Sequence, residues 1–548
     1  MSARSAHDGP VLSNPAARTA ADPVRLPAVE AIEIVLLLLA VVALITVVAR
    51  RIGVPYPILM VVGGLLLGFV PELPRVSLDP EIVLLLFLPP ILFSAAYQSS
   101  PRELWRNVRP ISLLALGLVL TTTAAVAIVT VNLVPGIGWP AAIALGAIVS
   151  PPDAIAATAI AQRLGLPRRL VTILEGESLV NDSTALVTYR LAVAAAVPGA
   201  AFMPVEAVIT FFWVAIGGVV IGLAVGWLTT WLLARLDDPP VEVLLTLLAP
   251  FAAYLPAEQL HVSGVLAAVS GGLFLGWRAP RVMSADTRIL GVGAWQMTIF
   301  VVNGLAFVLI GLQLPAVMET VGARPVAELA TMALAVSATV IGVRLAWVFP
   351  ATYLPRWLIP GIARRDPAPP ASAVLVLGWA GMRGAVSLAA ALALPAGFPE
   401  RDLLVFLTFV AILATLVGQG LSLPALIRRL GLGDDGSAEH EELHAREAAT
   451  NAALARLDQL DGEIPGHRPL IDQLRDRYAH RAEHYVHDHA GGGMPVDAEE
   501  RDHEAIRHAV LTAERLAVIE LRDRGVIGDE ALRRVQHDLD LEDLRRDV

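Results

Sequence analysis

Carboxylates, an amide and hydroxyls lie together in Glu175 to Val187, EGESLVNDSTALV, within a run otherwise apolar enough to cross a membrane. In a helix, residues three and four apart share a face, so Ser178 lies beside Asp182 and Glu177 beside Asn181. An ionisable group in a membrane span costs roughly 2.5 to 3.5 kcal/mol and usually serves function. We therefore interpret one polar stripe as a candidate cation site and the other as its support. The alternative is a structural cluster whose polar groups satisfy one another.

The rest of the chain is typical of a protein that crosses a membrane many times. It has 548 residues, of which 55% are hydrophobic and 17% charged, and its mean hydropathy is +0.64. This composition predicts an all-α polytopic membrane protein with about thirteen transmembrane helices. The expected segments are 30–49, 55–71, 80–98, 110–133, 139–162, 169–197, 207–234, 240–257, 261–277, 286–314, 325–353, 371–396 and 402–427. The chain has no cysteine, which excludes disulfides and thiolate metal sites.

The arginines predict the orientation of these segments. One to three arginines follow each odd-numbered segment, beginning with Arg50 and Arg51, whereas the alternate loops hold only Arg75, Arg324 and Arg401. Short cytoplasmic loops are enriched in basic residues. We therefore expect a multi-pass protein of the plasma (inner) membrane with its N-terminus outside and its C-terminus in the cytoplasm. Its expected surroundings are membrane lipid, and no nucleic-acid partner is predicted.

Thirteen spans can be divided into six, a linker and six, which gives inverted six-helix repeats. Segments five and twelve are then equivalent, and each carries a charged residue beside helix-breaking residues: SPPDA at Ser150 to Ala154 and GMRGA at Gly381 to Ala385. Interrupted spans in matching places indicate a transporter site near the bilayer midplane. The alternative is that Pro and Gly are simply common in membrane helices.

The two ends of the chain differ from this core. Residues 1–29 are expected to form a disordered extracytoplasmic tail, 30–430 the transmembrane domain, and 431–548 a helical cytoplasmic domain. Helices are expected near 439–460, 470–489, 499–524 and 529–546, with a break at the glycines 491–493. This domain is rich in histidine, so it could sense cytoplasmic pH. A solvated histidine-rich surface is an equal alternative, and a transition-metal site is the weakest.

Several motifs together resemble one family. The stretch GESLVND (Gly176 to Asp182) is similar to the asparagine-aspartate motif of the monovalent cation:proton antiporter-1 family, the NhaP and mammalian NHE type. SPPDA, GMRGAVS, FVVNGLAFVLIGLQL from Phe300 and FLPPILFSAA from Phe87 occur in the family's order and spacing. The resemblance covers about 31–430. It implies an NhaA-like fold with two broken, crossing helices, and a homodimer.

The resemblance also implies roles for individual residues. Na+ would bind at Asp182, Ser178 and Asp153, with backbone carbonyls around Pro152 completing the site. Asn181 matches the asparagine that stands where electrogenic relatives have a second aspartate.

Two arginines would form a supporting charge network. Glu177 and Asn181 would be held by an arginine, for which Arg344 matches better than Arg383. The guanidinium of Arg383 would offset the carbonyl end of a half-helix, as Asp153 offsets an amide end.

Two positions depart from the pattern of the relatives. Relatives often have an acidic residue in place of Ser94 and a threonine in place of Pro152. Both departures bear on ion affinity, on the active pH range and on the preference between Na+ and K+, none of which the sequence decides.

The chemistry of these residues favours ion exchange. Hard cations prefer oxygen ligands, and a carboxylate that binds either a cation or a proton couples the two fluxes. One such carboxylate predicts electroneutral one-for-one Na+(Li+)/H+ antiport, unless Asp153 also titrates. Such a protein would serve pH homeostasis, needs no cofactor and is not an enzyme.

Other functions remain as alternatives. A K+/H+ antiporter on the same fold is the nearest one. A cation channel is more remote because no filter pattern is present. A membrane enzyme is also remote because HExxH, GxSxG and P-loop motifs are absent.

Overall fold

The computed structural model describes residues 28–70, 80–196, 204–321, 324–433, 437–463 and 467–489, with scattered residues between 510 and 539. All regular elements in these ranges are helical. The chain divides into two compact units, Met1–Asp434 and Asp435–Val548. The expected tail 1–29 lies outside the described residues apart from its last two. The same holds for the glycines 491–493 and most of the expected helices 499–524 and 529–546.

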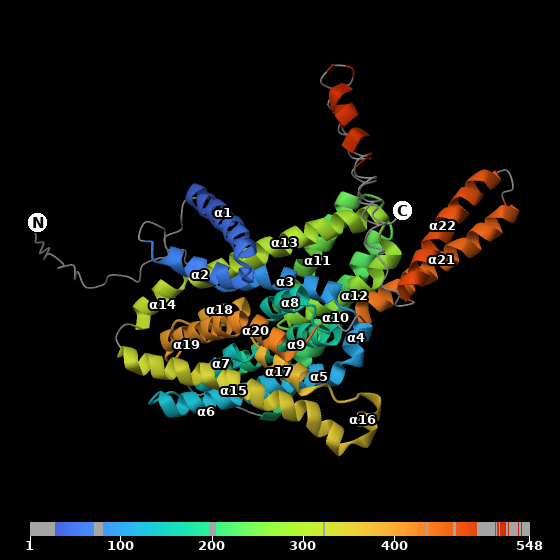
Figure 1. The fold of residues 1–548 in the computed structure, drawn as a ribbon. Helices are drawn as coiled ribbons and strands as arrows, with labels where there is room; N and C mark the ends of the chain where they lie inside the picture. The colour runs from blue at the N-terminus through green and yellow to red at the C-terminus, as the bar shows by residue number, and fades with distance from the viewer. Residues whose placement is uncertain are drawn as a thin grey trace, which may run out of the picture. The chain divides into compact units, whose positions relative to one another are not determined.

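Unit 1 contains the elements labelled in Figure 1. They are α1 (Ala28–Ile52), α2 (Tyr56–Gly68), α3 (Pro80–Gln98), α4 (Pro101–Arg106), α5 (Val108–Ser112), η1 (Leu113–Leu118), α6 (Val119–Leu133), α7 (Trp139–Val149), α8 (Ala154–Arg163), α9 (Arg168–Ala195), α10 (Pro204–Leu233), α11 (Pro239–Gln259), α12 (Gly264–Val282), α13 (Ala285–Leu312), α14 (Leu314–Val321), α15 (Val326–Leu358), α16 (Pro360–Arg365), α17 (Ala371–Trp379), α18 (Ala385–Leu392), α19 (Arg401–Leu413), η2 (Ala414–Gln419) and α20 (Gly420–Leu430). The elements η1 and η2 are π-helical.

Local sequence signals set many of the helix ends. Asp238 caps α11 by accepting a hydrogen bond from the backbone N–H of Val241, and Ser263 caps α12 in the same way. At the other end, Gly431 takes the left-handed conformation after α20, with φ of 62°. Some helices extend beyond the expected ranges. For example, α15 extends past 353 to Leu358 despite Pro355.

Each expected apolar segment is helical, as one helix or as consecutive pieces. Within the described residues, seven stretches are by themselves long and apolar enough to cross a membrane. They are Glu33–Ile52, Val108–Leu133, Ile209–Leu233, Pro239–Gln259, Ala285–Glu319, Val326–Leu358 and Arg401–Leu430. The chain is therefore a multi-pass membrane protein, while the count of about thirteen spans stays a prediction.

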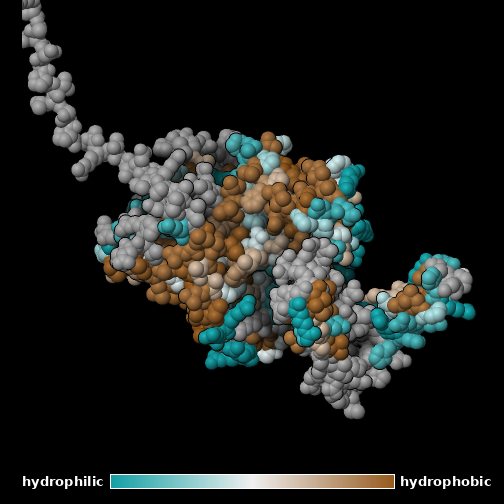
Figure 2. Space-filling model, turned by 90° about the horizontal axis from the view of Figure 1, so that it is seen from above, coloured by the Kyte–Doolittle hydropathy of each residue, from teal (hydrophilic) through white to brown (hydrophobic). Residues whose placement is uncertain are grey.

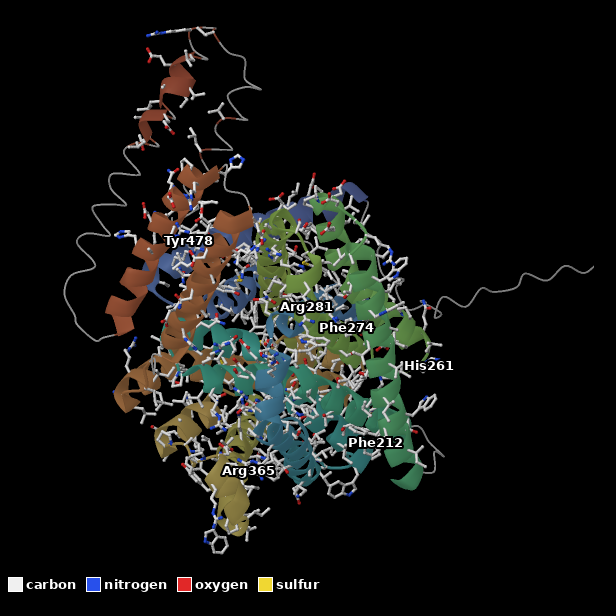
Figure 3. The ribbon with its side chains drawn as sticks, turned by 90° about the vertical axis from the view of Figure 1, so that its right-hand side faces the viewer. Phe212, His261, Phe274, Arg281, Arg365 and Tyr478 are labelled. Atoms are coloured by element: carbon white, nitrogen blue, oxygen red, sulfur yellow. The ribbon has the colours of Figure 1, made fainter. Side chains whose placement is uncertain are left out.

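Large apolar side chains cover the outside of unit 1, as the brown areas in Figure 2 show. On α10, Phe212 is 58% exposed and Trp213 70% exposed, and Phe212 lies on the outer face in Figure 3. Val220 and Trp227 are also exposed on this helix. A helix face of this kind is unfavourable in water and suits contact with lipid.

The helices of unit 1 form two packed groups. In the first bundle (α1–α3 and α10–α13), α2 packs on α13, and α12 packs on α3, α10 and α11. Glycine permits this close approach, because a Cβ at Gly64 would lie 2.1 Å from the carbonyl oxygen of Val308. In the second bundle (α5–α9, η1, α15, α17–α20 and η2), α7 packs on α6 and α9, and α15 packs on α6 and α17. The two broken segments, α7–α8 and α17–α18, both belong to the second bundle.

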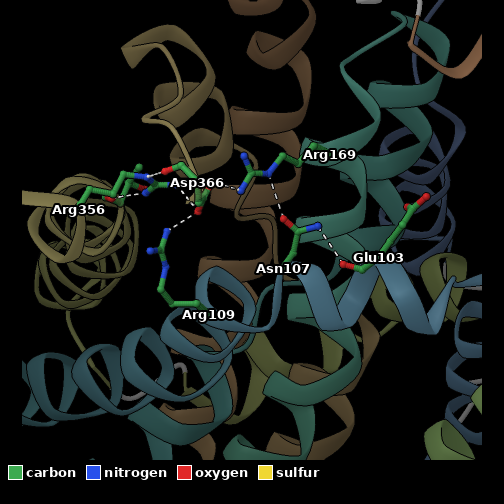
Figure 4. A network of polar contacts seen from close by, with 7 residues as sticks. Glu103, Asn107, Arg109, Arg169, Arg356 and Asp366 are labelled. Carbon is green, nitrogen blue, oxygen red and sulfur yellow. Dashed lines mark hydrogen bonds and ion pairs between the residues drawn. The ribbon is translucent and has the colours of Figure 1, made fainter. Parts of the chain in front are cut away.

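One carboxylate ties together an end of the second bundle (Figure 4). Asp366, between α16 and α17, accepts hydrogen bonds from Arg109 at 2.6 Å, Arg169 at 2.7 Å and Arg356 at 2.8 Å. Arg169 also donates to Asn107. The three arginines come from α5, α9 and α15, so this contact fixes three helices at the arginine-rich end of the bundle.

Unit 2 contains α21 (Ser437–Glu463) and α22 (Arg468–His489), which pack against each other. These helices match the expected ranges 439–460 and 470–489. Leu457 and Ile471 are buried, and Arg475 pairs with Asp458 at 3.1 Å. Within the described residues, no group of three or more His, Cys, Asp or Glu side chains could hold a metal ion.

Candidate functional site

The two broken segments meet at Asp153. Its backbone N–H donates to the carbonyl oxygen of Met382 at 2.6 Å, which joins the α7–α8 break to the α17–α18 break. Its Oδ1 accepts the N–H of Ile155 at 2.8 Å and so caps α8. Oδ2 lies against Gly384, where a Cβ would be only 1.8 Å away. Asp153 is therefore positioned by both breaks at once.

The polar stretch of α9 packs directly on this crossing. Glu177 is 1% exposed, Asn181 0% and Asp182 5%, while Ser178 is half-buried. Asn181 donates through Nδ2 to the carbonyl oxygen of Pro152 at 2.9 Å. Because Asn181 and Asp182 are consecutive, this bond holds the Asp182 backbone beside the break.

Glu177 and Arg344 form a buried, two-point ion pair. The Nη1 to Oε1 distance is 2.5 Å, the Nη2 to Oε2 distance is 2.8 Å, and both side chains are 1% exposed. Arg344 also donates to the carbonyl oxygen of Leu377 at 3.2 Å. The expectation that the same arginine holds Asn181 is wrong, because the Asn181 amide is turned to Pro152 and its Oδ1 has no partner among the described residues.

Arg383 is fully buried and bonds to backbone carbonyls instead of a carboxylate. Its Nε donates to Val149, the last residue of α7, at 2.8 Å, and its Nη1 donates to Gly381 at 2.6 Å. Its own N–H donates to Thr415 Oγ1 at 3.1 Å. The carbonyl ends of half-helices are electronegative, so the guanidinium neutralises the end of α7 while the Asp153 carboxylate caps the start of α8.

Around the crossing, the two arginines have polar partners, whereas the two aspartates have no cationic partner among the described residues. Arg344 has Glu177, and Arg383 has carbonyls, but Asp182 has neither a hydrogen bond nor an ion pair with any described residue. The carboxylate of Asp153 accepts a hydrogen bond from the backbone N–H of Ile155 and from no other described residue, and it is near enough to interact electrostatically with Asp182. Two close carboxylates without a cationic partner form a site that favours a cation or a proton.

Ser94 and Pro152, the two positions expected to depart from the family pattern, both take part in hydrogen bonds. Ser94 is 2% exposed and accepts a hydrogen bond from Gln98 Nε2 at 3.0 Å. Pro152 contributes its backbone carbonyl to Asn181.

Several residues at the crossing were not predicted from the sequence. Gly384 is part of the GMRGA motif, but its role depends on the contact with Asp153. Thr415 and Gln419 lie on η2, and a π-helix has no signal that hydrophobic periodicity would reveal. Only the polar residue types in an apolar run could have drawn attention to them.

These features are those of a multi-pass membrane protein with carboxylates at crossing helix breaks. The chain belongs to the sodium/hydrogen exchanger family, because the family model "Sodium/hydrogen exchanger, transmembrane" matches residues 36–429. A relative from Mycobacterium tuberculosis, named as an uncharacterized Na+/H+ exchanger, is 38% identical over 523 residues, covering 93% of this chain and 95% of the relative. The sodium, potassium, lithium and rubidium/H+ antiporter of Bacillus pumilus is 35% identical over 409 residues, covering 72% and 60%.

A solved structure has the same fold. The sodium proton antiporter MjNhaP1 from Methanocaldococcus jannaschii matches with a TM-score of 0.58 at 18% identity, covering 73% of this chain and 99% of that one. The predicted family is confirmed by the family model and these relatives. The match confirms the predicted all-helical antiporter fold in outline, while the count of about thirteen spans and the inverted six-helix repeats stay predictions.

Proposed function

We propose that this protein is an electroneutral Na+(Li+)/H+ antiporter in which one cation and one proton compete for Asp182. The observation that carries the proposal is that Asp182 is 5% exposed and has no cationic partner among the described residues. Ser178, one helical turn away, and Asp153 would supply further oxygen ligands for Na+. Protonation of Asp182 would release the cation, and cation binding would release the proton.

The supporting residues would keep a single exchangeable charge at the site. The charges of Glu177 and Arg344 cancel each other, and Arg383 is held by carbonyls. Asn181 is neutral and holds the break through Pro152. If Asp153 stays ionised throughout the cycle, each crossing carries one cation or one proton, and the exchange is electroneutral.

Alternating access would move the second bundle against the first. The breaks and the α9 stretch all lie in the second bundle, so the bound ion would travel with it. The first bundle would be the anchor and would form a homodimer. We place the protein in the plasma membrane, with its N-terminus outside and its histidine-rich unit 2 in the cytoplasm, where its activity would serve pH homeostasis.

A K+/H+ antiporter is the second candidate. The Bacillus pumilus relative is named for potassium as well as sodium, lithium and rubidium. The ligand types at Asp182 and Ser178 do not by themselves select an ion size.

Proton flux in proteoliposomes tests both candidates. Na+, Li+ or K+ is added to the wild type and to Asp182→Asn with the membrane potential clamped at zero and then at an imposed value. We expect flux with Na+ or Li+ that is independent of the potential and is lost in the variant. Flux with K+ alone would change the substrate, and flux that survives in Asp182→Asn would reject the proposed site.

A further inference from the structure

Gln419, at the end of η2, is a buried polar residue that the antiport scheme leaves without a role. Its side chain is 2% exposed, and neither Oε1 nor Nε2 has a hydrogen-bond partner among the described residues. A buried carboxamide without partners destabilises a fold. Such a group in a native protein calls for an explanation, of which a bound water or ion is one.

The neighbours of Gln419 place it against the α17–α18 break. Thr415, one turn earlier on η2, accepts the backbone N–H of Arg383 at 3.1 Å. Gly420, the next residue, lies so close to Met382 that a Cβ there would be 3.2 Å from its sulfur. The carbonyl of Met382 in turn accepts the N–H of Asp153. Gln419 therefore lies between two contacts with the residues that position Asp153.

The helix around Gln419 also faces the half-helix that Asp153 caps. The element α20, which begins directly after Gln419, packs against both α8 and α17. The half-helix α8 begins at the crossing, and its residues Thr158 and Ala159 are half-buried. Gln419 therefore directly precedes the helix that packs on α8, the half-helix that Asp153 caps.

The π-helical geometry adds a local argument. Residues 414–419 adopt the wide turn of a π-helix, a rare conformation that occurs frequently at functional sites. The extra residue of such a turn changes the angular position of the side chains that follow it. The rare π-helical backbone and the buried, unpartnered carboxamide therefore occur together at Gln419.

We propose that Gln419 is a further residue of the ion pathway, whose carboxamide oxygen binds the partly hydrated monovalent cation on the α8 side of Asp153. This inference rests on the proposed antiport at Asp182. A neutral oxygen ligand suits a transit position, because it replaces a water of the cation without adding a charge that would hold it. The amide N–H groups can donate to a water that the cation keeps.

Replacement of the carboxamide tests this role. Gln419→Leu removes the polar atoms at similar volume. We expect the apparent KM for Na+ to rise about tenfold, with the maximal flux retained at saturating Na+. The Tm of the detergent-solubilised protein should stay equal or rise, because a buried group without partners is replaced by an apolar one. Gln419→Glu, which keeps a carbonyl oxygen, should restore a low KM and change the pH profile of transport.

Gly418→Ala is the matched control, since it lies on the same π-helix and a Cβ there meets no atom within 4 Å. Its KM should equal that of the wild type. A lower Tm with unchanged KM in Gln419→Leu would mean a structural role and would overturn the inference. If Asp182→Asn loses flux while Gln419→Leu keeps the wild-type KM, the site at Asp182 stands and the role of Gln419 fails. Flux that persists in Asp182→Asn would overturn both.

Discussion

Arg190 on α9 and Glu258 on α11 form an ion pair of 2.7 Å between the second and first bundles. Glu258 also accepts the N–H of Gly264, the first residue of α12, at 3.2 Å. A small pocket between α7, α9 and α18 is lined by Pro151, Ser387 and Tyr189, the residue before Arg190. The pair thus closes the two bundles on the side of the site away from α8.

If transport separates the bundles on that side, Arg190→Gln should favour the opened state. An exposed pair contributes about 0.2–1 kcal/mol, so the opened population should rise about 1.5- to 5-fold. The chain has no cysteine, so a single Ser387→Cys can report access to an impermeant maleimide. We choose Arg190 because its substitution leaves the bond from Gly264 to Glu258 intact. Equal labelling rates with and without Arg190→Gln would contradict this gating role.

Gly384→Ala should abolish transport. The new methyl would collide with Oδ2 of Asp153, and the carboxylate or the break must move. Overpacking of this kind costs about 1–3 kcal/mol of stability. Flux and Tm of the purified protein are compared with those of Gly397→Ala, where no atom lies within 4 Å of the added Cβ. Normal flux in Gly384→Ala would show that the observed Asp153 position is not required.

The ion pair of Glu177 and Arg344 should stabilise the fold. Removing one partner of a buried ion pair costs about 3–5 kcal/mol, because the other charge stays buried and unpaired. Arg344→Met alone should therefore sharply lower the yield of folded protein. The double variant Glu177→Leu and Arg344→Met should recover much of it, as measured by size-exclusion profile and Tm. A double variant no more stable than the single one would indicate that the polar bond to Leu377 matters more than the charges.

The Asp366 cluster should make the fold sensitive to acid. Partial burial raises the pKa of Asp366, but the hydrogen bonds and charges of Arg169 and Arg356 outweigh it, so its pKa is held below the usual value. A depressed folded-state pKa gives stability that is present above the unfolded pKa of about 4. That stability is lost as pH falls through the lower folded value.

Asp366→Asn should therefore lower Tm at neutral pH and converge with the wild type in acid. The free energy of unfolding at neutral pH should fall by about 1 kcal/mol or less, since the group is partly exposed to solvent. Thermal unfolding of both proteins across a pH series measures it. A Tm difference that is constant down to the most acidic pH would assign the effect to packing instead of charge.

The sequence predicted those parts of the site that depend on residue type along the chain. Apolar runs placed the helices, and the Pro and Gly residues at 150–154 and 381–385 placed both breaks. Arg344 was matched to Glu177 by family resemblance, since 167 residues separate them. The bond from Asn181 to Pro152, the pair of Arg190 and Glu258, and the arginines around Asp366 depend on tertiary packing. No spacing along the chain encodes them.

The guanidinium of Arg383 bonds only to backbone carbonyls among the described residues, and this bears on how many ions the proposed site could hold. Its backbone neighbours, Met382 and Gly384, both touch Asp153, so the Arg383 guanidinium is anchored next to the carboxylates. Among the described residues, no acidic side chain forms an ion pair with the Arg383 guanidinium. A second cation that approached an occupied site would meet both the bound ion and the guanidinium. If the proposed site at Asp182 holds, we therefore expect one cation at a time, without the queue of ions that push one another forward in a conducting pore.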